Sequence, residues 1–192
     1  ELKFGADGGF PATYAGVAFT GSIDRIDVNA QGEAVIIDYK HKAAQALSSY
    51  AVQKSAVEQN PEGGMPSHEE LPRHVQAIIY AQVVRTYLKS RNLTSVGAMY
   101  LGTHQNYALY GAAPESYINK IFGLSDEQKP SKGMLSCVAG DTVGAFNEYL
   151  DAWEDKIKQA VERMLNGDIH AHALDKEACA YCPVMNCSER KR

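Results

Sequence analysis

The stretch GSIDRIDVNAQGEAVIIDYK, residues 21–40, decides the fold of this chain. Its second half, residues 34–40, is rich in β-branched side chains, and turn-forming residues at 30–33 separate it from a longer apolar run at 14–29. Two strands joined by so short a turn form an antiparallel hairpin. We therefore predict one long strand over 14–29 and a second over 34–40, both central and buried because apolar side chains occupy both of their faces.

Charged side chains interrupt this apolar hairpin at Asp24, Asp27, Asp38 and Lys40. Counting back from a turn at residues 30–32 places Asp24 opposite Asp38. Because side chains alternate along a strand, Asp24, Asp38 and Lys40 then share one face. Asp27 lies an odd step away and is expected on the other face. The pattern thus predicts two carboxylates and one ammonium group at one spot in an apolar sheet.

This group of charges has two interpretations. Two carboxylates with open positions suit Mg²⁺, and a nearby lysine can orient the attacking water or stabilise charge on a phosphate. Alternatively, Asp38 and Lys40 form a buried salt bridge, because unpaired burial of either charge is costly, and Asp24 only accepts hydrogen bonds. For Arg25 and Asp27, two residues apart on one face, an ion pair is the favoured interpretation.

The rest of the chain predicts a succession of helices and strands. Residues 71–91 have the periodicity of an amphipathic helix, with an apolar stripe at Leu71, Val75, Ile78, Ile79 and Val83. A second amphipathic helix is expected over 141–166, ending near Gly167. The other expected elements are an edge strand at 1–5, a helix at 43–59, one or two strands within 95–111, and non-periodic segments at 60–70, 123–140 and 168–192.

The composition is that of an ordinary globular protein of 192 residues, of which 45% are hydrophobic and 22% charged. These values exclude a disordered or collagen-like chain, and the length fits one domain. No apolar run is long enough to span a membrane and no signal peptide precedes the first strand, so we expect a cytoplasmic protein without membrane contacts. The start at Glu1 instead of Met indicates a piece of a longer protein. The net charge of −4, taken alone, argues against nucleic-acid binding.

GSIDRID at 21–27 and VIIDYK at 35–40 together resemble the signature of RecB-like PD-(D/E)XK nucleases. The resemblance implies a restriction-endonuclease-like α/β core, with a central mixed β-sheet flanked by helices, and DNA hydrolysis with Mg²⁺ or Mn²⁺. It further implies that Asp24 and Asp38 hold the metal and that Lys40 is catalytic. The family also carries a Gln-x-x-x-Tyr pair near the active site and the DNA, which Gln76 and Tyr80 match in RHVQAIIYAQ.

Several positions add to this pattern or depart from it. Without a functional role, Gln76 would be a solvated polar residue and Tyr80 a residue at the rim of the core. Family members usually continue the DYK unit with Thr-Gly, whereas this chain has His41-Lys42, and they have an upstream helix that supplies a His or Glu near the metal. Glu1, in ELKFG, resembles a Glu-x-x-Phe-Gly segment that precedes the hairpin. From charge and position we predict phosphate contacts by Arg25, Lys42 and Arg73.

Three cysteines, Cys179, Cys182 and Cys187, fall within the stretch CAYCPVMNC at 179–187. Zinc and iron–sulfur centres both take four ligands, so one is missing locally. Cys137, His170 or His172 could supply it, and free thiols or a disulfide are the alternatives. We interpret Cys137 as a small buried hydrophobic residue.

CAYCPVMNC resembles the C-terminal cysteine motif of AddB-type helicase–nuclease subunits, and the resemblance covers nearly the whole chain. It implies a nuclease core at residues 1–170 and a cysteine segment at 171–192 packed on the same domain. In that family the three cysteines and a distant upstream one hold a [4Fe–4S] cluster, which in this chain would be absent or replaced by zinc. The implied function is exonuclease action on single DNA strands fed by a helicase, with a partner subunit, in double-strand break repair and recombination.

Two other functions stay open. One is a non-catalytic DNA-binding or subunit-docking module with a structural metal cluster, and the other is an iron–sulfur nuclease of the CRISPR-adaptation type, which shares the cysteine arrangement. The intact Asp-x-Lys with Asp24 opposite favours catalysis over the first alternative. An acidic metal site also reconciles the net charge of −4 with a DNA substrate.

Overall fold

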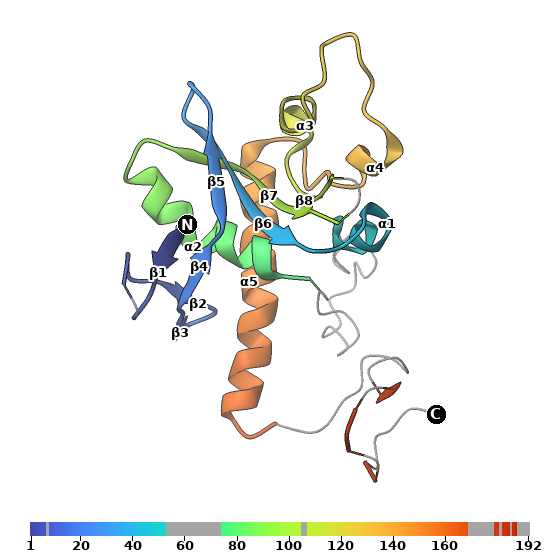
Figure 1. Ribbon diagram of the computed structural model, residues 1–192. Coiled ribbons are helices and arrows are strands. Elements are labelled where there is room, and N and C mark those ends of the chain that lie inside the picture. The colour runs from blue at the N-terminus through green and yellow to red at the C-terminus, as the bar shows by residue number, and fades with distance from the viewer. Residues whose placement is uncertain are drawn as a thin grey trace, which may run out of the picture.

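The computed structural model describes residues 1–6, 8–52, 74–104, 107–168, 179–180, 182–184 and 186–187. Four strands form its centre: β5 (Arg25–Val28), β6 (Glu33–Lys40), β7 (Thr94–Gly102) and β8 (Ala108–Ala112). They make one mixed sheet in the order β5-β6-β7-β8 (Figure 1). β6 pairs antiparallel with β5 and parallel with β7, and β8 returns antiparallel to β7. The expected α/β fold with a central mixed sheet flanked by helices is confirmed.

The β5–β6 hairpin has the predicted register. Its paired residues are Arg25–Ile37, Ile26–Ile36, Asp27–Val35 and Val28–Ala34. Asp24 comes directly before β5, so one further step in the same register sets it opposite Asp38. Asn29 closes the turn, because its side-chain oxygen accepts hydrogen bonds from the backbone N–H groups of Gln31 and Glu33, both at 3.0 Å. Such bonding to nearby backbone is typical of asparagine in turns.

The single long strand expected over residues 14–29 is wrong. The chain instead forms β2 (Thr13–Tyr14), β3 (Val17–Ala18), β4 (Gly21–Ile23) and then β5. Ala15 and Gly16 have positive φ angles of 52° and 80°, and they reverse the chain between β2 and β3. Glycine adopts such angles at little cost, but the apolar residues around it resemble an uninterrupted strand. β4 pairs antiparallel with β1 (Leu2–Phe4), which confirms the short N-terminal strand.

Two long helices, α2 (Gln76–Lys89) and α5 (Val143–Leu165), pack on one face of the sheet (Figure 1). They share with it one core of buried side chains that includes Ile36, Val84, Tyr100 and Leu150. α5 begins at Thr142, whose Oγ1 accepts a hydrogen bond from Ala145 N at 3.2 Å, and its last turn precedes Gly167. Both amphipathic helices are thus confirmed over their described residues. In the part of the chain that the structure describes, no helix combines the length and apolar character needed to cross a membrane.

A polar network holds α2 against α5 and against the β2–β3 turn. Gln82 Nε2 on α2 donates hydrogen bonds to Glu154 Oε2 at 2.6 Å and to Asp151 Oδ1 at 2.8 Å on α5. Glu154 Oε1 accepts from Ala15 N at 3.0 Å, and Arg85 forms an ion pair with Asp151 at 2.7 Å. These contacts hold the second half of α2 against α5.

Two shorter helices, α3 (Glu115–Ile121) and α4 (Lys132–Leu135), lie on the opposite face of the sheet. With the sheet they enclose a second small core, formed by Ile37, Met99, Ala113, Ile118 and Cys137. The loop expected over 123–140 is therefore wrong at α4. This short helix begins at Ser131, whose Oγ accepts a hydrogen bond from Met134 N at 3.4 Å.

The helix expected over 43–59 is wrong in its described part, because it stops early. It consists of α1 (Ala44–Leu47) and the 3₁₀ helix η1 (Ser48–Tyr50), after which Ala51 is extended. The hydroxyl groups of Ser48 and Ser49 donate hydrogen bonds to backbone carbonyls three residues back, and such local bonds compete with helix continuation. Residues 53–73, which include the expected loop at 60–70, lie outside the described residues.

Candidate active site

β6 directs Asp38 and Lys40 toward the face of the sheet that α2 covers. Ala34 and Ile36 belong to the core under α2, and Asp38 and Lys40 continue the same alternation. Asp38 is buried, with 2% of its surface exposed, whereas Tyr39 points to the other face and is exposed. Asp24, at the junction of β4 and β5, is also exposed. The hairpin thus sets a buried carboxylate beside one that reaches solvent.

A backbone hydrogen bond ties Asp24 to β6. Tyr39 N donates to Asp24 Oδ2 at 2.9 Å, which brings the negative charge of Asp24 close enough to act on Asp38. Burial raises the pKa of Asp38 above its ordinary value, the Lys40 ammonium opposes this rise, and the charge of Asp24 adds to it. A divalent cation bound to both carboxylates would relieve the cost of burial and the repulsion between them.

Lys40, Gln76 and Tyr80 continue a chain of contacts that starts at Asp38. Lys40 Nζ lies 2.6 Å from Asp38 Oδ2 as an ion pair, and it donates a hydrogen bond to Gln76 Oε1 at 2.6 Å. Gln76 Nε2 in turn donates to Tyr80 Oη at 2.9 Å, as two residues one helical turn apart can do. The structure therefore brings together the side chains predicted for the catalytic site, with Asp24 joined through the backbone of β6.

Asp38 Oδ2 is a buried oxygen without a hydrogen bond. Its contact with Lys40 has the distance of an ion pair but not hydrogen-bond geometry, and no other donor among the described residues reaches it. The ammonium group of Lys40 compensates the charge of this oxygen, and the carboxylate has no second donor among the described residues. Because Mg²⁺ and Mn²⁺ prefer oxygen ligands, Asp24 and Asp38 fit a hard divalent cation. No group of three His, Cys, Asp or Glu side chains gathers in the described part of the chain.

Tyr100 on β7 supports the site and was missed by sequence reasoning. Its Oη accepts a hydrogen bond at 2.9 Å from Ala77 N, in the first turn of α2. The residue at the helix start, Val75, has no side chain able to accept this bond, so Tyr100 satisfies an N–H group that the helix leaves open. Tyr100 is placed there because it pairs with Asp38 in the parallel β6–β7 register, which local sequence patterns do not reveal.

Tyr100→Phe is expected to lower the free energy of unfolding by about 1–2 kcal/mol, because it leaves the buried N–H of Ala77 without an acceptor. Urea denaturation measures this change. The matched control is Tyr110→Phe on the neighbouring strand β8, whose hydroxyl group makes no hydrogen bond within the described residues. Equal losses in the two variants would show that the bond to α2 contributes nothing.

The predicted phosphate contacts lie in different surroundings. Arg25 forms a two-pronged ion pair with Asp27, at 2.6 and 2.7 Å, on the face of the hairpin away from α2. This is the ion pair that their spacing favours. Lys42 is exposed beyond the end of β6, with its Nζ 5.3 Å from the ring centroid of Tyr50. Arg73 lies outside the described residues.

Glu1 comes directly before β1 and contacts β4, the strand that leads to Asp24. Leu2 pairs with Ile23 in the β1–β4 ladder, so the same register sets Glu1 opposite Asp24. Its Oε1 accepts a hydrogen bond from Ser22 Oγ at 2.8 Å. This bond engages the Glu1 carboxylate with β4.

Among the described residues, no group of three potential metal ligands includes a cysteine. Cys179 is buried, and Cys182 and Cys187 are half-buried. His170 and His172 lie outside these residues. Cys137 is packed in the second core, where burial raises the pKa of its thiol, as expected for a small buried hydrophobic residue.

The fold and the site together define a restriction-endonuclease-like domain, in which a hairpin sets one aspartate opposite an Asp-x-Lys strand end. The chain belongs to the PD-(D/E)XK nuclease superfamily, whose family model matches residues 1–187. Nucleases of this superfamily generally use divalent metals, and carboxylates such as those of Asp24 and Asp38 are ligands of the type that these metals prefer. No curated protein and no solved structure matches the chain.

Proposed function

We propose that this chain is the nuclease domain of an AddB-type helicase–nuclease subunit and that it hydrolyses single-stranded DNA with Mg²⁺ or Mn²⁺. The observation that carries the proposal is the series of contacts from Asp38 through Lys40 and Gln76 to Tyr80, with Asp24 beside it. A buried salt bridge needs one acid and one base. This group adds a second carboxylate and two aligned polar side chains.

The biological setting of the proposal rests on the cysteine motif. In an AddB-type subunit, the domain would trim strands delivered by a helicase, as an exonuclease, during double-strand break repair and recombination. The division into a core at 1–170 and a cysteine segment at 171–192 belongs to the same proposal.

Each side chain has a distinct part in the proposed reaction. Asp24 and Asp38 bind the metal ion, which when bound withdraws charge from the phosphate and lowers the pKa of water. Lys40 orients the attacking water or stabilises the charge that develops on the phosphate oxygens. Gln76 accepts a hydrogen bond from Lys40 and Tyr80 accepts one from Gln76, so the two α2 residues position the ammonium group and border the DNA.

One observation favours the non-catalytic alternative. Lys40 already neutralises Asp38 in the structure, as it would in a DNA-binding or subunit-docking module whose hairpin acids form only a salt bridge. Such a module would hold DNA without cleaving it. The CRISPR-adaptation alternative is also a nuclease, so an assay of DNA cleavage distinguishes the non-catalytic module from both nuclease functions.

The deciding experiment follows degradation of end-labelled single-stranded DNA by the full subunit, with Mg²⁺ and with EDTA. Asp38→Ala is expected to remove Mg²⁺-dependent degradation, because it removes a proposed metal ligand. Asp27→Ala is the matched control, since Asp27 is a carboxylate of the same hairpin on its other face, and it should leave degradation unchanged. Equal degradation by the parent and Asp38→Ala, or none by the full subunit, would contradict the catalytic role.

For the cysteine segment we propose that Cys179, Cys182 and Cys187 bind a [4Fe–4S] cluster in the full-length protein, with zinc as the substitute in a shorter chain. The support is the motif and the preference of such clusters for thiolate ligands. Anaerobically purified full-length protein should be brown and contain iron. A sample with neither iron nor zinc would count against the metal site.

A further inference from the structure

A cluster of basic side chains follows the proposed catalytic residue Lys40. β6 and β7 are parallel neighbours whose last pair is Lys40–Gly102, so the residues after both strands emerge at the same edge of the sheet. His41 follows β6 and His104 follows β7, and their rings meet edge to face with centroids 4.8 Å apart. Lys42 comes next after β6. All three side chains are exposed.

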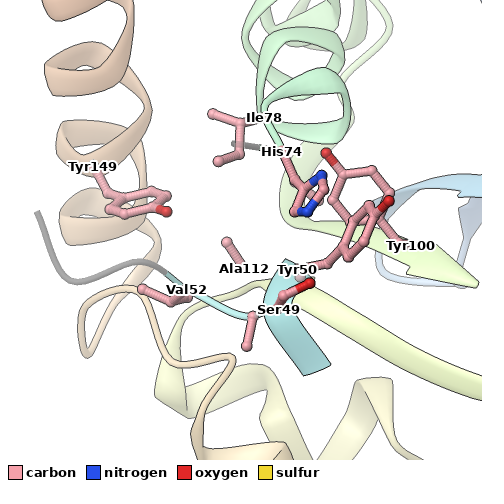
Figure 2. A pocket seen from close by; sticks show the side chains of 11 residues that line it. Ser49, Tyr50, Val52, His74, Ile78, Tyr100, Ala112 and Tyr149 are labelled. Atoms are coloured by element: carbon pink, nitrogen blue, oxygen red, sulfur yellow. The ribbon is translucent and has the colours of Figure 1, made fainter. Parts of the chain in front are cut away.

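An aromatic stack under this edge supports two lysines. Figure 2 shows Tyr50, His74 and Tyr100 close together. The rings of Tyr50 and Tyr100 meet at 4.8 Å, and His74 stacks flat on Tyr50 at 3.5 Å between centroids. Lys40 Nζ lies 5.7 Å from the Tyr100 centroid and Lys42 Nζ lies 5.3 Å from that of Tyr50. Aromatic faces attract cations at such distances, so each ring of this pair attracts one ammonium group.

Among the described residues, no carboxylate pairs with these basic side chains. Arg25, Arg85 and Lys120 are each engaged in an ion pair. Within the described residues, His41, Lys42 and His104 have no such partner, so their N–H groups can bind an anion. Beside a phosphodiesterase site, the anion that fits is a backbone phosphate of DNA, which lysine and other N–H donors bind without reading sequence.

We propose that His41, Lys42 and His104 bind a backbone phosphate adjacent to the scissile one on the same DNA strand, with Tyr50 as the positioning residue for Lys42. The proposal rests on the proposed nuclease function and adds to it the path of the strand past the C-terminal ends of β6 and β7. It also assigns a role to the His-Lys pair that follows the Asp-x-Lys strand end.

Equilibrium binding of a fluorescein-labelled single-stranded oligonucleotide without divalent metal tests this cluster independently of cleavage. The triple variant His41→Ala/Lys42→Ala/His104→Ala is expected to bind about tenfold more weakly than the parent at low salt. Its plot of log affinity against log salt should be shallower, by about 0.7 for each phosphate that the variant no longer neutralises. The control Lys89→Ala removes an exposed cation at the far end of α2, about 20 Å along the helix from Gln76, and should bind as the parent does.

The outcomes separate this proposal from the proposed nuclease function. If the parent binds DNA and the triple variant shows the same affinity and salt slope, the phosphate cluster is wrong and the nuclease function stands. If the parent itself does not bind DNA in this assay, the phosphate cluster is wrong, and degradation with Mg²⁺ still decides the nuclease function. In cleavage assays the triple variant should raise KM with little change in kcat, because it touches no reacting atom.

The role of Tyr50 is tested by two substitutions. Tyr50→Phe keeps the ring face under Lys42 and should bind DNA as the parent does, whereas Tyr50→Leu should bind about threefold more weakly. The double variant Tyr50→Leu/Lys42→Ala should bind DNA as strongly as the single variant Lys42→Ala, because the ring acts only through this lysine. Equal binding by Tyr50→Phe and Tyr50→Leu would show that the ring does not position the lysine.

Discussion

Asp38→Asn is expected to slow cleavage of single-stranded DNA by roughly a thousandfold and, at neutral pH, to raise the free energy of unfolding. The loss of cleavage follows because asparagine replaces one of the two carboxylates proposed to hold the metal. A substitution that slows the reaction but stabilises the fold indicates that the residue serves catalysis and does not contribute to stability.

The expected gain in stability follows from the direction of the pKa shift at Asp38. Burial, with the charge of Asp24 added, raises this pKa in the folded chain, so the folded state binds more protons here than the unfolded state. The contribution of Asp38 to stability therefore grows as the pH falls through its folded pKa, and it is least favourable near neutral pH. Asparagine is neutral at every pH. Lys40 is 25% exposed and keeps its hydrogen bond to Gln76, so its ammonium tolerates the loss of the partner.

Urea denaturation of parent and variant over a series of pH values from neutral downward tests this prediction beside the degradation assay. The stability advantage of Asp38→Asn should be largest at neutral pH and shrink as the pH falls through the folded-state pKa of Asp38. Asp27→Asn, on the other face of the hairpin, should keep full cleavage. A less stable Asp38→Asn at neutral pH would mean that the ion pair with Lys40 outweighs the cost of burying the carboxylate.

The parts of the site that the sequence predicts are those set by local geometry. A short turn and the alternation of side chains are enough to group Asp24, Asp38 and Lys40, and the structure has that register. The four-residue spacing of Gln76 and Tyr80 likewise places both side chains on one side of a helix. Local spacing does not show which strand end this helix faces. The position of Gln76 and Tyr80 beside the hairpin was implied by the family resemblance alone.

The parts that could not be predicted depend on pairing between distant segments or on single backbone angles. Tyr100 reaches the first turn of α2 only because β7 pairs in parallel with β6 across a long connection. His41 and His104 meet for the same reason. The reversal at Ala15 and Gly16 lies among apolar residues that favour a strand, and only the positive φ angles reveal it.

Lys40→Met is expected to bind Mn²⁺ about tenfold more tightly than the parent while cleaving DNA at least about a hundredfold more slowly. Lys40 Nζ lies 2.6 Å from Asp38 Oδ2, so a cation that binds this oxygen must displace the ammonium or tolerate it as a neighbour. Two like charges at about 4 Å near a protein surface repel by several kcal/mol, which makes the lysine a competitor for the metal. Cleavage falls because the proposed orientation of water and stabilisation of phosphate charge are removed.

Calorimetric titration with Mn²⁺ measures the first effect, and thermal unfolding gives an independent check. Without metal, Lys40→Met should be less stable than the parent, because the buried charge of Asp38 is left unpaired. Added Mn²⁺ should then raise its melting temperature more than that of the parent, since ligand stabilisation grows as the dissociation constant falls.

The control is Lys42→Met, which removes an ammonium group that lies over Tyr50, and it should match the parent in Mn²⁺ affinity. Weaker Mn²⁺ binding by Lys40→Met would contradict the competition, and binding by neither protein would favour the non-catalytic module, in which Lys40 and Asp38 need only each other.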